Sequence, residues 1–591
     1  MRYGTRMESD RAMGPLRVGR VTSCMLALAL VLAGCTQFGP YRAASLDVQP
    51  SKPVALKPAE CWSGARPAAP PAGTESLAPC EPPPAAGVSA KTIEDVGRAS
   101  IQHRHYVYRG SGDAAPRRHG EYDLAFVEFD DQGWFEQRGQ MEALFMRLRQ
   151  IEVGARAPEN GHVLILVYVH GWKHNASQCD DNVICFSRLL ERMDILEREL
   201  RDEKEPRRQV VGVYVGWRGL SLDAGILSNV TFWTRKATAE RVGRGGVTEL
   251  FSRLDDYRHA RNPGREDDKT QLVVAGHSFG GLVLYSALAH SLMERAVHVG
   301  GTTCGPAAAP GPTAPCYATA RSFGDLVVLV NPAFEGSLYE PLFHITTNRC
   351  YGPEQRPVML TVTSSADAAT GTAFPLGRSL NTRFEHARSA DQNDSIRQAV
   401  GHDARYQTHA LKWTGPPGVE PRAAADTACG CRHLEPTQTF AWWEFAKSVQ
   451  RVLAQPGAPA VAGAREVPPP VKAHPGKTRM YDFYGDNVQL EGDAKYSANY
   501  PYLVVKADGE IIKDHNSIYS EPFIRFLHAF FLVHIAAQRP FEATGPFEAA
   551  GCARDIEACA PGGRIPCEAS CQLPLPGGGS CSGRSLEDLR R

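Results

Sequence analysis

Apolar runs alternate with amphipathic stretches through the middle of the chain. The run Val163–Val169 (VLILVYV) is apolar throughout and rich in β-branched residues, which is typical of a strand buried on both faces. Similar strand patterns occur at Tyr122–Phe129, Val210–Val215, Gln271–Ala275, Leu326–Val330, Val358–Val362 and Tyr502–Lys506. Helical patterns separate these strands, at about 135–150, 183–200, 238–261 and 282–295, near Tyr339, and at 521–536. This alternation predicts an α/β fold: a mostly parallel, doubly wound sheet with helices on both faces.

Composition separates this core from its flanks. The 591 residues are 43% hydrophobic, which is enough for a large core and excludes wholesale disorder. The flanks are rich in Pro, Ala, Gly or Cys, and a loose stretch with several Pro and Gly lies at 455–477. We expect a signal peptide at 1–34, a Pro/Ala-rich tether at 35–90, a core at 91–375 and 491–540, an insertion or lid-like region at 376–490, and a flexible tail at 541–591.

The N-terminal segment has the pattern of an export signal. Arg17 and Arg20 precede the apolar run Met25–Ala33, which is well short of the ~20 residues that a bilayer-spanning helix needs. The run closes with Leu-Ala-Gly-Cys at 32–35, which resembles the lipobox of bacterial lipoproteins. That resemblance implies acylation of Cys35, and the Thr36 that follows implies the outer membrane. We expect an exported protein, lipid-anchored in a bacterial cell envelope, with the tether acting as a spacer.

The charge balance and the cysteine content bear on which partners, disulfides and metal sites we expect. The 65 basic residues balance the 65 acidic ones, which argues against a nucleic-acid partner bound through a general positive field. Of the 16 Cys, Cys24 would leave with the signal and Cys35 would carry lipid, which leaves 14. In an oxidising compartment these favour disulfides, with plausible local pairs at Cys61/Cys80, Cys179/Cys185 and Cys304/Cys316. The Cys-rich tail has no Cys-x-x-Cys pair or nearby His, so we expect no metal there.

A glycine-rich turn follows the strand that ends at Ala275. The sequence Gly-His-Ser-Phe-Gly at 276–280 matches Gly-x-Ser-x-Gly between a strand pattern and a helix pattern, which is the context that this motif requires. A sharp turn of this kind strains the Ser backbone, and neighbours without Cβ relieve the crowding. The hydroxyl then projects above the sheet edge at a helix N-terminus, where developing negative charge is favoured.

With this turn and its context, the chain resembles the α/β-hydrolase superfamily over roughly 120–375 and 495–535. The resemblance implies that Ser278 is the nucleophile, whereas His277 only fills the first variable position of the motif. A His-Gly pair directly follows the strand Val163–Val169. By the same resemblance, the backbone N–H groups of Phe279 and Trp172 would form the oxyanion hole, which must aim donors at the developing charge.

Further residues at this sheet edge could line the substrate site. The candidates are His170, Gly171, Lys173, His174 and Arg218. The ordinary alternatives remain open: a polar loop in which Asn175 caps the next helix, and a structural Arg218 held by a loop carboxylate.

In this superfamily the acid and the base follow the nucleophile in the order Ser, Asp/Glu, His. Asp367 comes after the strand Val358–Val362, where the fold keeps its acid. Three His are contenders for the base. His515, between the last strand and the last helix, is favoured over His402 and His409, which have no clear strand before them. This choice leaves 148 positions (515 − 367) between acid and base, which we attribute to a long insertion before the last strand.

The sequence therefore predicts a membrane-tethered serine hydrolase that cleaves carboxylic esters, esterase- or lipase-like, through Ser278, Asp367 and His515 and an acyl-enzyme. The expected partner is a small-molecule acyl ester or lipid, and this chemistry needs no cofactor. The same machinery serves lipases, phospholipases, peptidases and acyltransferases, so it does not choose the substrate. The alternative is a non-catalytic surface or scaffold protein on the same frame, with its insertion and tail as binding elements.

Overall fold

The computed structural model describes 39–44, 99–109, 117–153, 161–177, 180–199, 207–219, 232–262, 270–299, 319–347, 351, 355–415, 478–481, 487–493, 496 and 500–536. The predicted signal peptide, most of the tether, much of the insertion and the tail lie outside these residues, as does Cys35. Cys185 lies inside them and is disulfide-bonded. Its pairing with Cys179 stays a prediction, because Cys179 lies outside the described residues.

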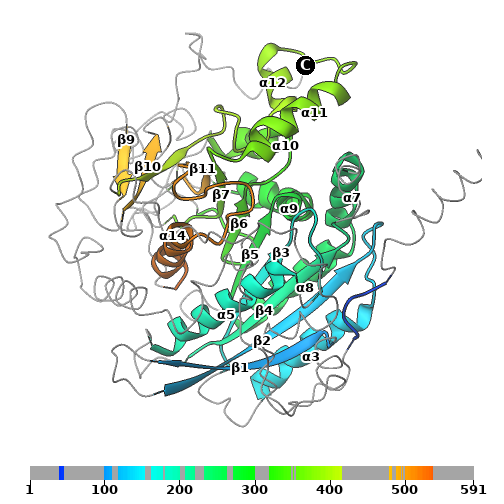
Figure 1. Cartoon of the computed structure of the whole chain (residues 1–591), viewed down its shortest axis with the longest axis vertical. Coiled ribbons are helices and arrows are strands. Elements are labelled where there is room, and N and C mark those ends of the chain that lie inside the picture. The colour runs from blue at the N-terminus through cyan, green and yellow to red at the C-terminus, as the bar shows by residue number, and fades with distance from the viewer. Residues whose placement is uncertain are drawn as a thin grey trace, which may run out of the picture.

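One large sheet forms the centre of the molecule (Figure 1). Its strands are β1 (Ile101–Arg109), β2 (Arg117–Phe129), β3 (Val163–Val169), β4 (Gln209–Trp217), β5 (Thr270–His277), β6 (Leu326–Val330), β7 (Met359–Ser364), β8 (His409–Trp413), β9 (Thr478–Tyr481), β10 (Val488–Asp493) and β11 (Tyr502–Ala507). They lie in the order β1-β2-β4-β3-β5-β6-β7-β11-β8-β10-β9. Neighbours from β2 to β8 pair in parallel, and β1, β10 and β9 pair antiparallel. The predicted α/β fold with a mostly parallel sheet is confirmed, and it is consistent with an α/β-hydrolase-like fold.

Helices cover both faces of the sheet. The described helices are α3 (Arg138–Val153), α5 (Asp181–Glu199), α7 (Phe232–Arg244), α8 (Gly246–Arg261), α9 (Phe279–Val297), α10 (Gly336–Thr347), α11 (Phe374–Asn381), α12 (Ala390–Arg397) and α14 (Glu521–Phe531), with short π-helical turns η2 (Ala369–Ala373) and η6 (Leu532–Ala536). The side chains of α5 and α14 join one core layer, and those of α3, α8 and α9 join the other. Among the helices that the structure describes, none is long and apolar enough to cross a bilayer.

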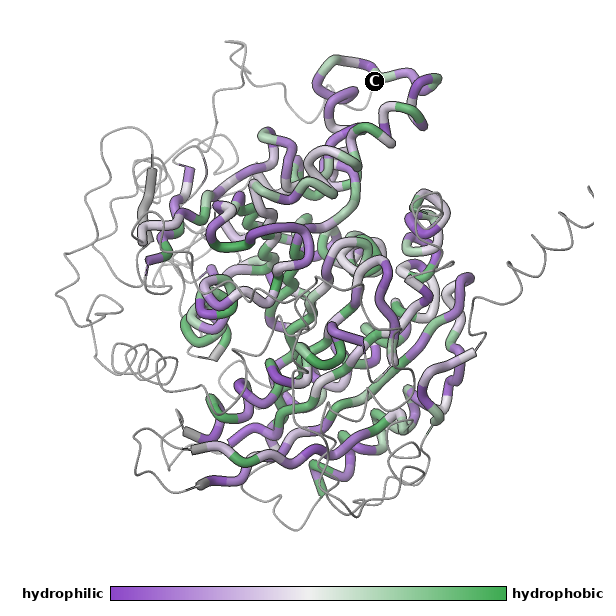
Figure 2. The backbone as a smooth tube through the Cα atoms, in the orientation of Figure 1, coloured by the Kyte–Doolittle hydropathy of each residue, from purple (hydrophilic) through white to green (hydrophobic). Residues whose placement is uncertain are grey.

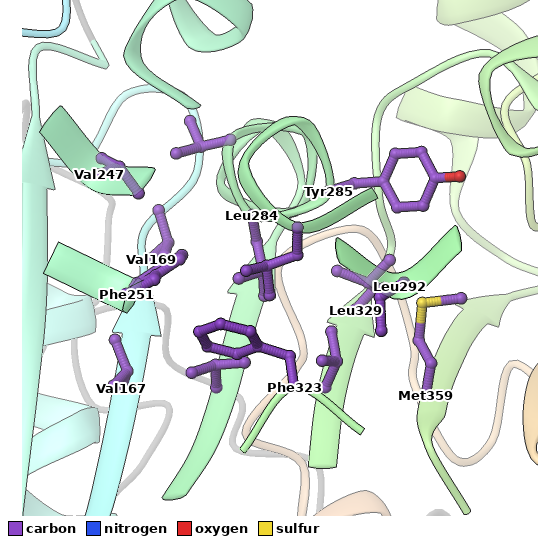
Figure 3. Close-up of a cluster of buried hydrophobic side chains, with 14 of the residues drawn as sticks. Val167, Val169, Val247, Phe251, Leu284, Tyr285, Leu292, Phe323, Leu329 and Met359 are labelled. Carbon is purple, nitrogen blue, oxygen red and sulfur yellow. The ribbon is translucent and has the colours of Figure 1, made fainter. Parts of the chain in front are cut away.

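The apolar run of β3 supplies both core layers at once. All seven of its residues are buried. Leu164, Leu166 and Tyr168 point to the layer of α5 and α14, and the four residues between and beside them point to the other. Because side chains alternate across a strand, a two-sided core requires an unbroken apolar run. Figure 2 shows hydrophobic residues gathered along the central strands, and Figure 3 shows the second layer, with Val167 and Val169 among its side chains.

One predicted helix is two helices in the structure. The pattern over 238–261 predicts a single helix, whereas α7 and α8 are separated at Gly245. Gly245 has φ −95° and ψ −137°, outside the helical region, and the N–H of Gly246 donates to the carbonyl of Gly133 at 2.7 Å. Adjacent glycines weaken a helix because their backbone loses more entropy on ordering, so this pair is where the helix breaks.

The sequence patterns do not predict four of the strands, β1, β8, β9 and β10. Along β1, the consecutive polar residues Gln102–His105 leave no apolar run, and the strand lies at the edge of the sheet. Strands β8 and β9 lie within the predicted insertion 376–490 and β10 begins in it, yet all three belong to the sheet, with β8 parallel to β11. These strands therefore extend the sheet, whereas α12 in the same region is helical. A lid-like role for the region stays a prediction.

The first described segment, 39–44, packs against β2 and α3 (Figure 1). Arg42 is only 1% exposed, and its backbone N–H donates to Oε1 of Glu128 at 2.8 Å. These residues lie within the predicted tether 35–90, which we expect from the sequence to act as a spacer. Part of that region is thus bound to the core.

Candidate active site

Ser278 lies at the turn between β5 and α9. It directly precedes α9, with φ 54° and ψ −120°, a region of backbone space that residues with a side chain rarely occupy. Its N–H donates to the carbonyl of Val330 at 3.0 Å, and its carbonyl accepts from the N–H of Ala333 at 3.1 Å. Strain of this kind persists where the surroundings impose it, and it concentrates at functional sites.

The two glycines of the motif allow the turn to pack tightly. A Cβ on Gly280 would lie 2.1 Å from the carbonyl oxygen of Val169, and a Cβ on Gly276 would lie 2.6 Å from that of Gly280. Both contacts are with backbone atoms, which cannot move aside as a flexible side chain could. The close approach of α9 to β3 therefore requires glycine at 280, and its close approach to β5 requires glycine at 276.

Three residues far apart in the sequence form one hydrogen-bonded chain. Nε2 of His515 lies 2.8 Å from Oγ of Ser278, and its Nδ1 lies 2.8 Å from Oδ2 of Asp367. His515 comes from the loop between β11 and α14, and Asp367 from the segment after β7. Because Nδ1–H donates to the carboxylate, Nε2 is left to accept the hydroxyl hydrogen. The arrangement is a base in contact with an alcohol and oriented by an acid.

Opposing effects act on the carboxyl group of Asp367, which is 1% exposed. Burial would raise its pKa, but hydrogen bonds from His515 and from the hydroxyl and N–H of Thr370 outweigh burial and lower the pKa to about 2. Oδ1 also accepts from the N–H of Ala369 at 2.9 Å. Asp367 is therefore ionised at neutral pH and can stabilise a charged imidazole.

A polar chain continues behind Asp367. The hydroxyl of Thr370 donates to Asp367, so its oxygen is left to accept from Nε2–H of His402, at 2.9 Å. Nδ1 of His402 in turn accepts from Nζ of Lys506 at 2.8 Å. Burial and the charge of Lys506 lower the pKa of His402 to about 4, and burial lowers the pKa of Lys506 to about 8. His402 is thus a neutral link between the acid and an ammonium group.

The third contender for the base, His409, lies at the start of β8. Its Nδ1 is 2.8 Å from the hydroxyl oxygen of Thr408. Of the three contenders, the structure places His515 at hydrogen-bonding distance from Ser278.

Two side chains that the sequence analysis did not assign hold the backbone of His515. Nε2–H of His277 donates to the carbonyl oxygen of His515 at 2.8 Å, and Nδ2 of Asn331 donates to the same oxygen at 2.9 Å. Burial and the charge of His515 lower the pKa of His277 well below its usual value, so it acts as a neutral donor. Asn331, with φ 45°, also accepts from the N–H of Ser364 at 2.9 Å. The only sequence signals were a His in the motif and a polar residue after the buried strand β6.

The loop after β3 runs beside the serine. A Cβ on Gly171 would lie 3.0 Å from Cβ of Ser278, so the backbone leading to Trp172 passes at contact distance. His170 is fully buried: the N–H of Trp217 donates to its Nε2 at 3.0 Å, and its Nδ1–H donates to the carbonyl of Gly171 at 2.9 Å. This leaves no ring nitrogen of His170 for a substrate. The residue instead ties together the ends of β3 and β4.

Lys173 and His174 follow in the same loop. Lys173 is exposed, has φ 71°, and places Nζ 4.6 Å from the centre of the Trp172 ring. His174 donates from Nδ1 to Asp180 at 3.0 Å. The N–H of Asn182 also donates to Asp180, at 2.9 Å, so Asp180 caps α5, and the alternative in which Asn175 caps this helix is wrong.

Arg218 lies at the end of β4 with 30% of its side chain exposed, and Nη1 is 3.9 Å from a carboxylate oxygen of Asp131. Arg235 also binds Asp131, at 2.8 Å, and donates to the backbone carbonyl of Arg218 at 3.0 Å. This geometry matches the alternative in which a loop carboxylate holds Arg218.

Aromatic side chains from three elements and the loop after β3 gather beside the serine. The ring of Phe232 lies 4.7 Å from that of Phe279, 5.2 Å from Trp172 and 6.5 Å from Phe374, and Trp233 lies 5.9 Å from Phe374. We call these five residues the aromatic cluster. Trp172, Phe232 and Trp233 keep part of their surface exposed, so the cluster offers apolar contact area next to the nucleophile.

One group of side chains within the described ranges has spacing compatible with a metal ion. His103 and His105 on β1 and Glu121 on β2 have ligand atoms within 4.8 Å of one another. Hydrogen bonds that the imidazole donates to the carboxylates of Asp123 and Glu121 raise the pKa of His103 to about 9, so the His103 ring holds a proton at neutral pH. This cluster of His103, His105 and Glu121 lies two or more places in the sheet order away from β3 and β5, the strands that lead to the serine site.

No protein-family model and no curated protein sequence matches the chain. Among solved structures, it is similar to the phospholipase PlaB from Legionella pneumophila in complex with thio-NAD, at 11% identity and a TM-score of 0.19, over 43% of this chain and 47% of that one. The match thus spans about half the length of PlaB. A peroxisomal α/β-hydrolase from Saccharomyces cerevisiae, Lpx1, is similar at 10% identity and a TM-score of 0.19, over 78% of this chain and 96% of that one.

Proposed function

We propose that the chain is a serine hydrolase that cleaves carboxylic esters and is tethered to a membrane through lipid on Cys35. One observation carries the proposal: the hydroxyl of Ser278, at a strained turn, lies 2.8 Å from a His515 ring that an ionised Asp367 orients from the other side. An alcohol is a weak nucleophile until a base takes its proton, and this geometry supplies that base.

The proposed reaction has two steps. Oγ of Ser278 attacks the ester carbonyl while Nε2 of His515 takes its proton, and Asp367 stabilises the imidazolium. The N–H groups of Phe279 and Trp172 hold the oxyanion, and His515 then protonates the departing alcohol. Water, deprotonated by His515, releases the acyl group as a carboxylic acid and restores Ser278. The hydrogen bonds from His277 and Asn331 to the backbone carbonyl of His515 keep the imidazole in place through both steps.

The aromatic cluster supports an acyl group of appreciable length as substrate. Contact with apolar surface contributes about 0.8 kcal/mol for each buried CH₂ group, so a longer acyl chain gains more from this surface. Proposed export to a bacterial cell envelope, with the outer membrane favoured, would place the enzyme where acyl lipids are abundant. No cofactor enters the proposed chemistry.

A panel of p-nitrophenyl esters from acetate to palmitate tests this function. We expect kcat/KM to rise with chain length, and Phe232→Ala to lower it about 10-fold for the longest esters while leaving acetate nearly unchanged. Phe343→Ala is the matched control, since Phe343, on α10, is also partly buried but packs against Tyr406. Absence of hydrolysis of every ester by the wild type would contradict the proposal.

A further inference from the structure

The segment Pro40–Ala44, which we call the clamp, is fastened to the core by a dense set of contacts. The backbone N–H groups of Tyr41 and Arg42 donate to the two carboxylate oxygens of Glu128 at 2.9 and 2.8 Å. Nε2 of Gln140 donates to the carbonyl of Arg42 at 2.8 Å, and the N–H of Ala44 donates to Oε1 of Gln137 at 2.8 Å. This ordered attachment is not what a Pro/Ala-rich spacer alone would make.

The side chain of Arg42 joins the clamp to the catalytic edge of the sheet. Its guanidinium lies 3.8 Å from the centre of the Phe126 ring, and Nε donates at 2.7 Å to the carbonyl of Ala176, in the loop that also contains Gly171. Glu128 lies near the carboxyl end of β2, the same edge at which Ser278 follows β5. Strands β2 and β5 are three places apart in the sheet, or about 15 Å.

Chain length then limits how far a lipid on Cys35 can lie from the active site. Four residue steps separate Cys35 from Gly39, and even fully extended they reach only about 14 Å. Without the clamp, more than 60 residues would separate Cys35 from β1, and the domain could stand far from the bilayer.

We infer that the clamp holds the catalytic edge of the sheet against the membrane that carries the lipid anchor, so that the enzyme takes acyl esters embedded in that same membrane. This inference rests on the proposed function. It identifies the membrane-facing surface as the rim formed by the clamp, the loop after β3 and the aromatic cluster. The few residues between Cys35 and the clamp then set the distance to the bilayer.

Two insertions of one flexible linker separate this arrangement from a simple spacer. A 24-residue Gly/Ser linker, with a root-mean-square length of roughly 27 Å, is placed between Gln37 and Phe38 in one variant and between Ser51 and Lys52 in the control. The full-length lipidated proteins are reconstituted in phosphatidylethanolamine–phosphatidylglycerol vesicles that contain 4-methylumbelliferyl palmitate. We expect the first insertion to lower hydrolysis about 5-fold or more and the second to leave it unchanged, with both variants hydrolysing soluble 4-methylumbelliferyl butyrate at the wild-type rate. Equal effects of the two insertions would overturn the inference.

Neutron reflectometry on a supported bilayer gives a second readout that does not depend on activity. We expect the wild type and the control to leave a hydrated gap of no more than about 14 Å above the headgroups, and the first variant to leave a wider one. A wide gap for the wild type would overturn the inference even if esters are hydrolysed. A narrow gap with no hydrolysis of either ester would instead support the clamp and contradict the proposed function.

Discussion

Replacing His515 with alanine is expected to lower kcat/KM for a short ester by about 10⁴-fold or more, because among the residues that the structure describes His515 is the base hydrogen-bonded to the Ser278 hydroxyl. His402→Ala is the matched variant. It removes a histidine that contacts Thr370 and Lys506 rather than the nucleophile, and we expect a loss below about 10-fold. Initial rates on p-nitrophenyl butyrate, with folding checked by circular dichroism, measure both.

The comparison is informative because the sequence left both residues open as the base. A larger loss in His402→Ala than in His515→Ala would contradict the arrangement proposed for the site. Equal small losses would contradict the role of the whole hydrogen-bonded chain.

Asp367→Asn is expected to lower kcat by about 10⁴-fold with little change in fold. Oδ1 of Asp367 is fixed by the N–H groups of Ala369 and Thr370, so the new amide group would have to occupy the position of Oδ2, facing Nδ1 of His515. An NH₂ group there cannot accept from Nδ1–H. The imidazole would therefore carry its hydrogen on Nε2 and could no longer accept the Ser278 proton.

Asp403→Asn serves as the control for this substitution. Asp403 is also buried, at 5% exposure, but it accepts from the backbone and guanidinium of Arg405. We expect near wild-type turnover in that variant. Full activity in Asp367→Asn, measured across pH 6–9, would show that the carboxylate does not orient the base.

Strands with an unbroken apolar run were predictable from the sequence because burial on both faces leaves no polar position. The structure has β6 at Leu326–Val330, as predicted, and β3 at Val163–Val169. Strands at the edge of the sheet lack an unbroken apolar run, since part of each strand faces solvent or a loop and can carry polar residues. That is why β1, with its alternating His and Arg, was missed.

The candidate site was predictable where each residue follows a strand. Ser278 directly follows β5, Asp367 lies three positions after the end of β7, and parallel strands end at one edge of the sheet. The supporting contacts were not predictable, because they join residues far apart in the chain. His277 reaches a backbone carbonyl 238 positions away, and Arg42 reaches the loop after β3 over 134 positions. No local pattern encodes such pairs.

Labelling with a fluorophosphonate probe tests the central claim most directly. The probe's phosphorus is attacked by an activated serine oxygen and loses fluoride, so it marks a serine whose proton a base can remove. We predict that the full-length protein gains one covalent adduct, that mass spectrometry of its peptides places the adduct on Ser278, and that His515→Ala greatly slows its formation. An intact, folded wild type that forms no adduct, or forms it on another residue, would contradict the account.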